Sequence, residues 1–100
     1  MRRLTTPEHR FTLPYPVTEF KRVLITYSQG GRNILNKTLE DAETDGNTVI
    51  IRLTQEETKL FTTGSDVSIQ VRVLTGGGDA LASSAMRMAV FDVLNDEVLT

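Results

Sequence analysis

The sequence contains no cysteine and no tryptophan, and it has one histidine and three prolines among 100 residues. Without cysteine the chain has no disulfide, thiol nucleophile, thiolate zinc site or thiol redox switch. Its apolar runs reach only four residues, far below the ~20 needed for a membrane-spanning helix. We therefore expect neither a thiol enzyme nor a membrane protein.

Strong charge of one sign is also lacking. The formal net charge is -2, which does not favour binding to nucleic-acid phosphates. Hydrophobic residues make up 39% and charged residues 24%, which is typical of a folded domain rather than a disordered chain. Met1-Arg2-Arg3 is basic, but no apolar segment follows it, so we expect no signal peptide. The length predicts one domain.

β-branched residues alternate with polar residues along much of the chain, a pattern typical of strands with one buried face. The clearest example runs from Val67 to Val73, where every second residue is Val or Ile. Further strands are predicted at 11–13, 22–28, 33–39, 48–53 and 86–90.

Glycine-containing turns separate these strands at Gln29-Gly30-Gly31-Arg32, Asp45-Gly46-Asn47 and Gly76-Gly77-Gly78-Asp79. Six to seven short strands joined in this way predict an all-β, immunoglobulin-like antiparallel β-sandwich. A small barrel is the competing architecture.

One short helical turn is predicted after Thr54. Thr54 and Glu57 have the spacing of a capping box, in which each side chain accepts a hydrogen bond from the other residue's backbone N–H. At the end of this turn, Leu60 and Phe61 are expected to plug the end of the sandwich.

All three prolines lie within the first 16 residues. Since proline cannot donate to a sheet ladder, we predict that residues 1–16 form an extended arm or edge strand of the single domain 1–100. Residues 92–100 are predicted to form a C-terminal tail. Arms and tails of this kind can exchange between protomers.

No arrangement typical of a catalytic, cofactor or metal site is apparent. His9 has no recognisable nucleophile, and a solvent-exposed or pairing role is expected. Glu56 and Glu57 are adjacent on a helix, so their carboxyl groups do not face each other. We therefore predict no enzyme activity and no cofactor. A small enzyme or inhibitor would need acidic residues gathered with His9 in a cleft.

The acidic segment around Asp41, Glu43 and Asp45 resembles the opening of a calcium loop. The closing acid of such a loop would fall at Arg52, whose charge has the wrong sign. A solvated acidic connection that ends in an Asp-Gly turn is the favoured interpretation, and weak calcium binding is left open.

A protein interface is the remaining kind of site. Opposite the predicted core stripe, Leu24, Ile50 and Leu74 lie among polar residues, and Arg52 and Arg72 flank them. If neighbouring strands align these residues, they form an apolar patch with arginine at its border, which is typical of protein interfaces. Our hypothesis is that these five residues contact a partner or a second copy.

Seven short sequence words are spread over nearly the whole chain: Thr5-Thr6-Pro7, Phe11-Thr12-Leu13-Pro14, Ile25-Thr26-Tyr27-Ser28-Gln29-Gly30, Asp45-Gly46-Asn47-Thr48, Leu53-Thr54-Gln55-Glu56-Glu57-Thr58, Arg72-Val73-Leu74 and Ala80-Leu81-Ala82-Ser83. In these words the chain resembles a family of short phage and prophage proteins of Gram-positive bacteria, similar to the N-terminal domain of phage baseplate upper proteins. The resemblance implies a non-enzymatic structural or assembly protein of the tail or baseplate. Such a protein is made in the host cytoplasm, becomes part of the virion, and docks other phage structural proteins or further copies of itself.

A carbohydrate-binding module that contacts host cell-wall glycans is the alternative. Flat aromatic faces would have to be exposed for stacking on sugar rings. The chain offers only Tyr15 and Tyr27 as tyrosines, and Tyr27 is expected in the core.

Overall fold

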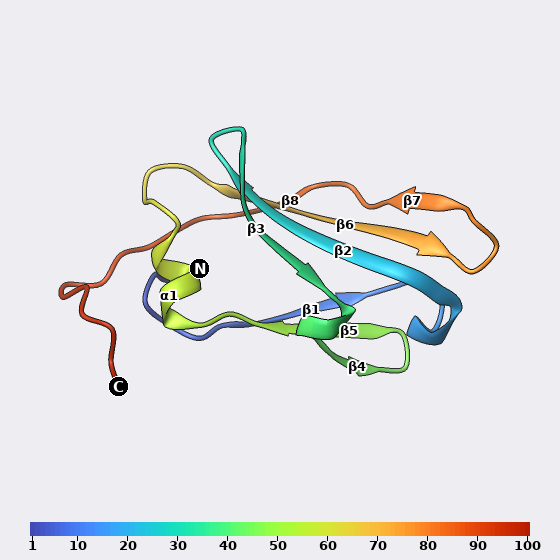
Figure 1. Ribbon diagram of the computed structural model, residues 1–100. Coiled ribbons are helices and arrows are strands. Elements are labelled where there is room, and N and C mark those ends of the chain that lie inside the picture. Colours follow the sequence, from blue (N-terminus) through green and yellow to red (C-terminus); the bar gives the residue numbers. More distant parts are fainter.

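Two antiparallel sheets face each other in the computed structural model, which describes residues 1–100 (Figure 1). The smaller sheet has the order β1-β5-β4, with β1 at Glu8–Thr12, β5 at Thr48–Arg52 and β4 at Glu43–Asp45. The larger sheet has the order β3-β2-β6-β7, with β3 at Arg32–Thr38, β2 at Phe20–Gln29, β6 at Val67–Thr75 and β7 at Ala80–Ala82; β8 (Met86–Met88) also pairs with β6. The predicted all-β sandwich is confirmed. It has eight strands rather than six to seven, and the two sheets do not close into a barrel.

The core forms because alternate residues of the strands point to the space between the sheets. In β2, Val23, Ile25 and Tyr27 are buried, while the residues between them are partly exposed. Strands β5 and β6 repeat this pattern from both sheets. The resulting cluster contains Phe11, Leu13, Phe20, Val23, Ile25, Tyr27, Val49, Ile51, Leu53, Phe61, Val67, Ile69, Val71, Val73 and Val90.

Three hairpins form at the predicted glycine turns. Gly30 and Gly31 connect β2 to β3 with φ of 60° and 75°, and Gly46 connects β4 to β5 with φ of 60°. These left-handed conformations strain residues that carry a Cβ atom. The glycine positions therefore fix where the chain reverses. Strands β4 and β7 were not predicted from the sequence, because neither alternates: Glu43–Asp45 is entirely polar and Ala80–Ala82 entirely apolar.

The short helix α1 (Gln55–Lys59) begins as predicted. Thr54 Oγ1 accepts a hydrogen bond from Glu57 N–H at 3.1 Å, and the Glu57 carboxylate accepts one from Thr54 N–H at 2.9 Å. After the helix, Phe61 is fully buried, but Leu60 is 56% exposed. The prediction that both residues plug the sandwich was wrong for Leu60, because neighbouring residues at the end of a helix point in different directions.

Two 3₁₀ turns complete the secondary structure, η1 at Val17–Glu19 and η2 at Leu39–Asp41. The N-terminal residues lie beside the start of the C-terminal tail, since Arg2 and Phe91 form an isolated parallel bridge. Beyond this bridge, residues 92–100 have no regular secondary structure, and they project at the end of the molecule near α1 (Figure 1).

Strand β2 lies in the larger sheet, between β3 and β6. In an immunoglobulin constant domain, the second strand belongs instead to the sheet of the first, fourth and fifth strands. Because β2 is absent from the smaller sheet, β1 pairs with β5 alone and its other side is a sheet edge.

Candidate docking site

The free side of β1 presents unpaired backbone groups. Leu13 N–H donates to the Asn47 carbonyl at 2.7 Å, and the antiparallel register with β5 continues back along the strand. In such a ladder alternate residues bond to the neighbouring strand, so the odd-numbered residues of β1 bond to β5. The N–H and C=O groups of Glu8, Arg10 and Thr12 therefore point away from β5.

Proteins commonly protect a free edge with charged side chains, proline or a β-bulge. Glu8 and Arg10 are charged and Pro7 and Pro14 stand on either side of β1, but neither a proline nor a bulge interrupts the backbone of Glu8–Thr12. Within the predicted arm or edge strand of residues 1–16, Glu8–Thr12 form a regular five-residue strand at the edge of the smaller sheet.

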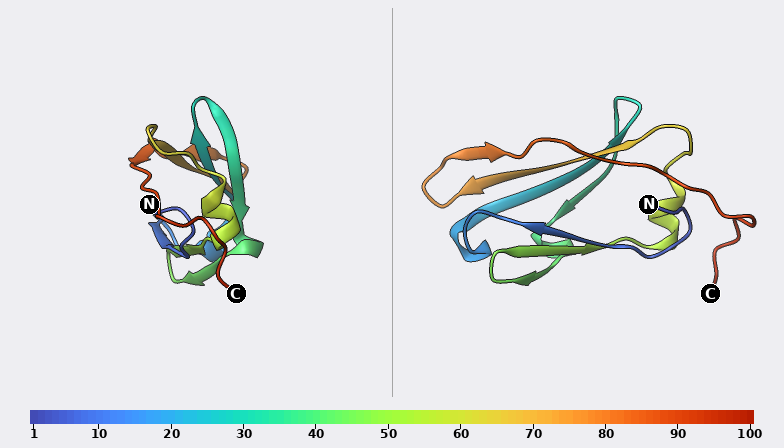
Figure 2. Two further views of the ribbon diagram at one scale, coloured as in Figure 1. Left: turned by 90° about the vertical axis from the view of Figure 1, so that its left-hand side faces the viewer. Right: turned by 180° about the vertical axis from the view of Figure 1, so that it is seen from behind.

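A mainly apolar cleft of about 510 Å³ runs between β1 and the edge of the larger sheet. Its lining comes from β1 and the residues after it, from β6, and from β7 to the start of β8: Arg10, Phe11, Thr12, Leu13, Pro14, Val71, Val73, Leu81, Ala82, Ser83, Ser84 and Met86. In the view from behind, β7 and β1 lie one above the other on this side of the sandwich (Figure 2). The sandwich is thus open along one side.

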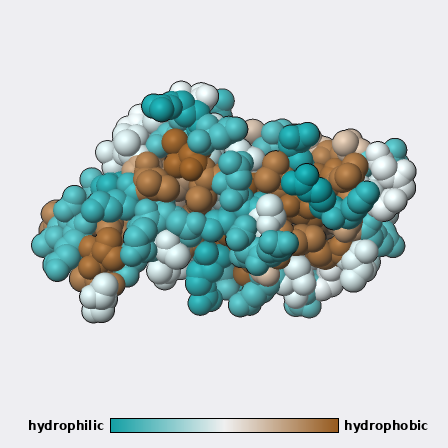
Figure 3. All heavy atoms as spheres, viewed as in Figure 1, coloured by the Kyte–Doolittle hydropathy of each residue, from teal (hydrophilic) through white to brown (hydrophobic).

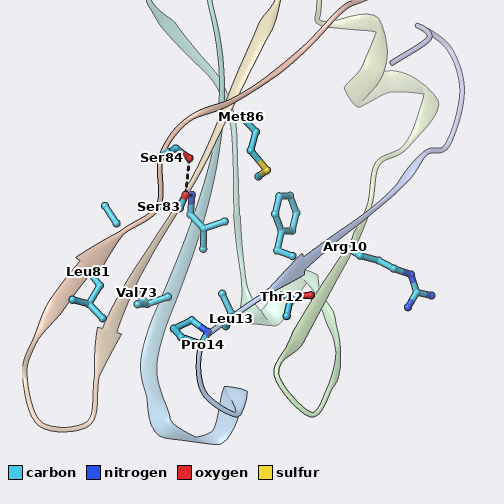
Figure 4. Close-up of a pocket in the computed structure, with 12 residues that line it drawn as sticks. Arg10, Thr12, Leu13, Pro14, Val73, Leu81, Ser83, Ser84 and Met86 are labelled. Carbon is cyan, nitrogen blue, oxygen red and sulfur yellow. Dashed lines mark hydrogen bonds between the residues drawn. The ribbon is translucent and has the colours of Figure 1, made fainter.

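The rim opposite β1 is apolar and only half covered. Leu81 and Met86 are 46% and 45% exposed, and the close-up shows Leu81 beside Val73 and Met86 farther along the cleft (Figure 4). Large half-exposed apolar side chains beside a hollow are typical of a surface that binds another molecule.

Between β7 and β8 the strand edge is interrupted at Ser83. The Ser83 hydroxyl accepts a hydrogen bond from Val71 N–H at 3.0 Å and donates to the Ser84 carbonyl at 3.0 Å (Figure 4). The Ser83 carbonyl accepts instead from the Gln70 side chain at 2.9 Å. The Ser83 hydroxyl thus donates to a backbone carbonyl rather than to a basic side chain.

Charges of both signs lie on the outer side of β1. The Glu8 carboxylate accepts hydrogen bonds from the guanidinium groups of Arg52 and Arg10, each at 3.2 Å. These hydrogen bonds hold the pKa of Glu8 below its usual value of 4.5. In the close-up the Arg10 side chain points away from the cleft (Figure 4), so the interior of the cleft is left without a charged group.

The five residues of the predicted interface do not form one surface. Leu24, Arg72 and Leu74 lie together on the outer face of the larger sheet, where Leu24 pairs with Arg72. Ile50 and Arg52 lie on β5, on the outer face of the smaller sheet. The prediction of a single patch was wrong, because alternation along a strand identifies a face but not the sheet to which the strand belongs. Figure 3 shows one side of the molecule, where apolar atoms are divided into separate patches by polar ones.

A polar cluster occupies the space between β1, β2, β3 and α1. His9 Nδ1 lies 2.7 Å from the hydroxyl of the buried Tyr27, and Lys37 pairs with Glu57. Burial lowers the pKa of His9 and raises that of Tyr27. Burial also opposes the charge of Glu57, but hydrogen bonds from Lys37 and Thr54 outweigh it and lower the pKa of this carboxyl. The pairing role predicted for His9 is confirmed.

The predicted acidic connection contains η2 and β4. Asp41 is engaged in capping η2, since its carboxylate accepts a hydrogen bond from Thr38 N–H at 2.9 Å. Glu43 and Asp45 are exposed on β4. No group of three potential ligands in the structure could hold a metal ion.

The apolar cleft could not be predicted from the alternation of residues along single strands. Phe11 and Leu13 were assigned to a strand but not to a cleft, and Leu81 and Met86 were not singled out. The available signal was the alternation of Glu8, Arg10 and Thr12 with inward-facing residues, bounded by Pro7 and Pro14.

Comparisons with protein-family models, curated proteins and solved structures found no match for this chain. None of its helices has the length and apolar character needed to cross a membrane.

Proposed function

We propose that this chain is a non-enzymatic structural or assembly module that docks other protein chains by strand addition at the free edge of β1. The observation that carries this proposal is the regular, unpaired edge Glu8–Thr12 directly along an apolar cleft. An added strand would satisfy the outward-pointing N–H and C=O groups, and alternate side chains would enter the cleft.

The chemistry of the cleft supports docking rather than catalysis. Arg10 is its only titratable lining residue, and its guanidinium group is bonded to Glu8 outside the hollow. General acid–base chemistry needs a group positioned to give or take a proton at the reacting atom. The cleft instead offers apolar side chains and a strand edge.

We further propose that the assembly is a phage tail or baseplate, so that the partners are other phage structural proteins or further copies of this chain. The resemblance carried by the sequence words above supports this setting. A component of that kind would be made in the host cytoplasm and end in the virion.

The glycan-binding alternative has no comparable support. Tyr27 is fully buried, and Tyr15 is the single exposed tyrosine, at 54%. One exposed ring does not make the flat aromatic surface that stacking on sugar rings requires.

Mass spectrometry of phage particles, purified from a host that encodes the chain, tests the proposal. We expect the protein in the particles at a fixed ratio to other tail proteins. Arg10→Pro removes one outward N–H without touching the β5 ladder, so it should fold but be lost from the particles. Arg10→Lys keeps both the N–H group and the positive charge and should be retained. Absence of the wild-type protein, or equal incorporation of Arg10→Pro, would contradict the proposal.

A further inference from the structure

The free edge of β1 is complementary to itself. Glu8 and Arg10 are both residues whose backbone groups point outward, and they carry opposite charges on the same exposed face of the strand. In a symmetric pair of identical strands, residue i faces residue j and residue j faces residue i. A second copy can therefore bring its Arg10 to Glu8 and its Glu8 to Arg10.

Only one of the neighbouring antiparallel registers produces this match. Placing Arg10 opposite itself, or Glu8 opposite itself, would put like charges directly across the ladder, which is destabilising. A shift that placed Glu8 opposite Pro14 would meet a residue without an N–H group. With Glu8 opposite Arg10, the two-fold axis passes at His9, and each pair exchanges both backbone hydrogen bonds.

The same register covers the cleft. An added strand lies ≈ 4.8 Å from β1, on the side that faces β7 and β8. It therefore runs along the mouth of the cleft, beside the half-exposed Leu81 and Met86. Apolar surface that each copy leaves in water becomes buried in the pair.

We infer that the occupant of this edge is β1 of a second copy, paired antiparallel about a two-fold axis with Glu8 opposite Arg10. This inference rests on the proposed docking at β1 and names the partner for it.

The C-terminal tail of another copy is a poorer occupant. It carries the exposed Leu94 and Leu99, but its apolar residues do not alternate. One set of alternate residues contains Glu97 and the other contains Asp96. Either set would bring a carboxylate into a cleft without a cationic group inside it, which is unfavourable.

Two charge variants test the pairing. Glu8→Arg places arginine opposite arginine, and Arg10→Glu places glutamate opposite glutamate. We expect each variant alone to dimerise at least about tenfold more weakly than the wild type, since the two symmetric pairs change from attraction to repulsion. A mixture of the two variants should form a heterodimer, because all facing charges are then opposite. The double variant Glu8→Arg/Arg10→Glu should recover the homodimer.

Light scattering after size-exclusion chromatography gives the oligomeric state, and native mass spectrometry separates the heterodimer from the homodimers. Arg72→Glu, on the outer face of the larger sheet, is the matched control and should dimerise like the wild type. Thermal unfolding of each variant confirms that it is folded.

Three results would overturn the inference. A wild-type monomer at near-millimolar concentration excludes the second copy, and the proposed function then stands or fails on the particle experiment. A dimer insensitive to both charge variants excludes this register. A dimer that is lost in Leu94→Ser but retained in both charge variants identifies the tail as the occupant.

Discussion

Glu8 shows how single residues prepare the edge for docking. Its carboxylate is shared between Arg10 and Arg52, and these contacts are exposed. Exposed ion pairs contribute little to stability. Their role in this account is to select the partner and the register, which is what charges around an interface do best.

His9 makes the stability of the fold depend on pH. Its pKa is lowered from 6.5, first by burial and to a smaller extent by the positive charge of the N-terminus. The unfolded chain therefore takes up the histidine proton at a higher pH than the folded chain does. The free energy of unfolding should be fully retained above pH 6.5 and fall as the pH drops below it.

Urea unfolding measured at a series of pH values checks this prediction. His9→Gln keeps a polar group near the Tyr27 hydroxyl and cannot titrate, so its stability should vary less between about pH 6.5 and 5. Glu8, Glu57 and Asp92 also have lowered pKa values. Their contribution is lost only at lower pH, in the ordinary range of carboxyl groups. If the free energy of unfolding fell equally for wild type and variant between pH 6.5 and 5, the assignment of this pH dependence to His9 would be contradicted.

At the scale of the element, α1 links the N-terminal arm to the sandwich. Thr58 is fully buried, and its hydroxyl donates to the Thr5 carbonyl at 3.0 Å. Glu57 completes the capping box and also pairs with Lys37 on β3. A helix of five residues is too short to be stable alone, so these contacts decide whether it forms.

Thr54→Ala removes the N-cap of this helix. The loss of one side-chain acceptor should lower the free energy of unfolding by about 1 kcal/mol. Thr63→Ala, in the exposed loop after the helix, makes the same chemical change without removing a cap and should have little effect. Urea titrations of both variants give the two values. If both variants lost the same free energy of unfolding, the N-cap would not stabilise α1.

The sequence predicted β2, β5 and β6 most clearly, because each of these strands buries every second residue. It also located the hairpins, since Gly30, Gly31 and Gly46 need left-handed backbone conformations. It could not assign strands to sheets, so Ile50 and Leu24 were placed on one surface although they lie on opposite sheets. The cleft was missed for the same reason. Phe11 and Leu81 are distant in sequence, and only the strand order brings their edges to the same side.

At the scale of the whole molecule, one side of the sandwich is open. The protein measures 48 × 29 × 15 Å, and β1 and β7 end the two sheets on the same side without covering each other. A small sandwich of this shape leaves part of its apolar interior accessible. Docking of a strand would close that side.

Leu81→Ser separates docking from folding. Because Leu81 is already 46% exposed, we expect the free energy of unfolding of the monomer to change by less than about 1 kcal/mol. Association should weaken, since the upper rim of the cleft loses apolar surface. Leu94→Ser, in the tail, is the control and should leave association unchanged. Analytical ultracentrifugation measures the dissociation constants; equal constants for Leu81→Ser and wild type would place the interface elsewhere.

The central claim is that the outward backbone groups of β1 are the docking site, and amide hydrogen exchange followed by NMR tests it most directly. In dilute protein, the amides of Phe11 and Leu13 should be protected by β5, while those of Arg10 and Thr12 should exchange fast. On docking, at high protein concentration or with a bound partner, Arg10 and Thr12 should become protected as well. Fast exchange at these two positions in the associated protein would contradict the claim.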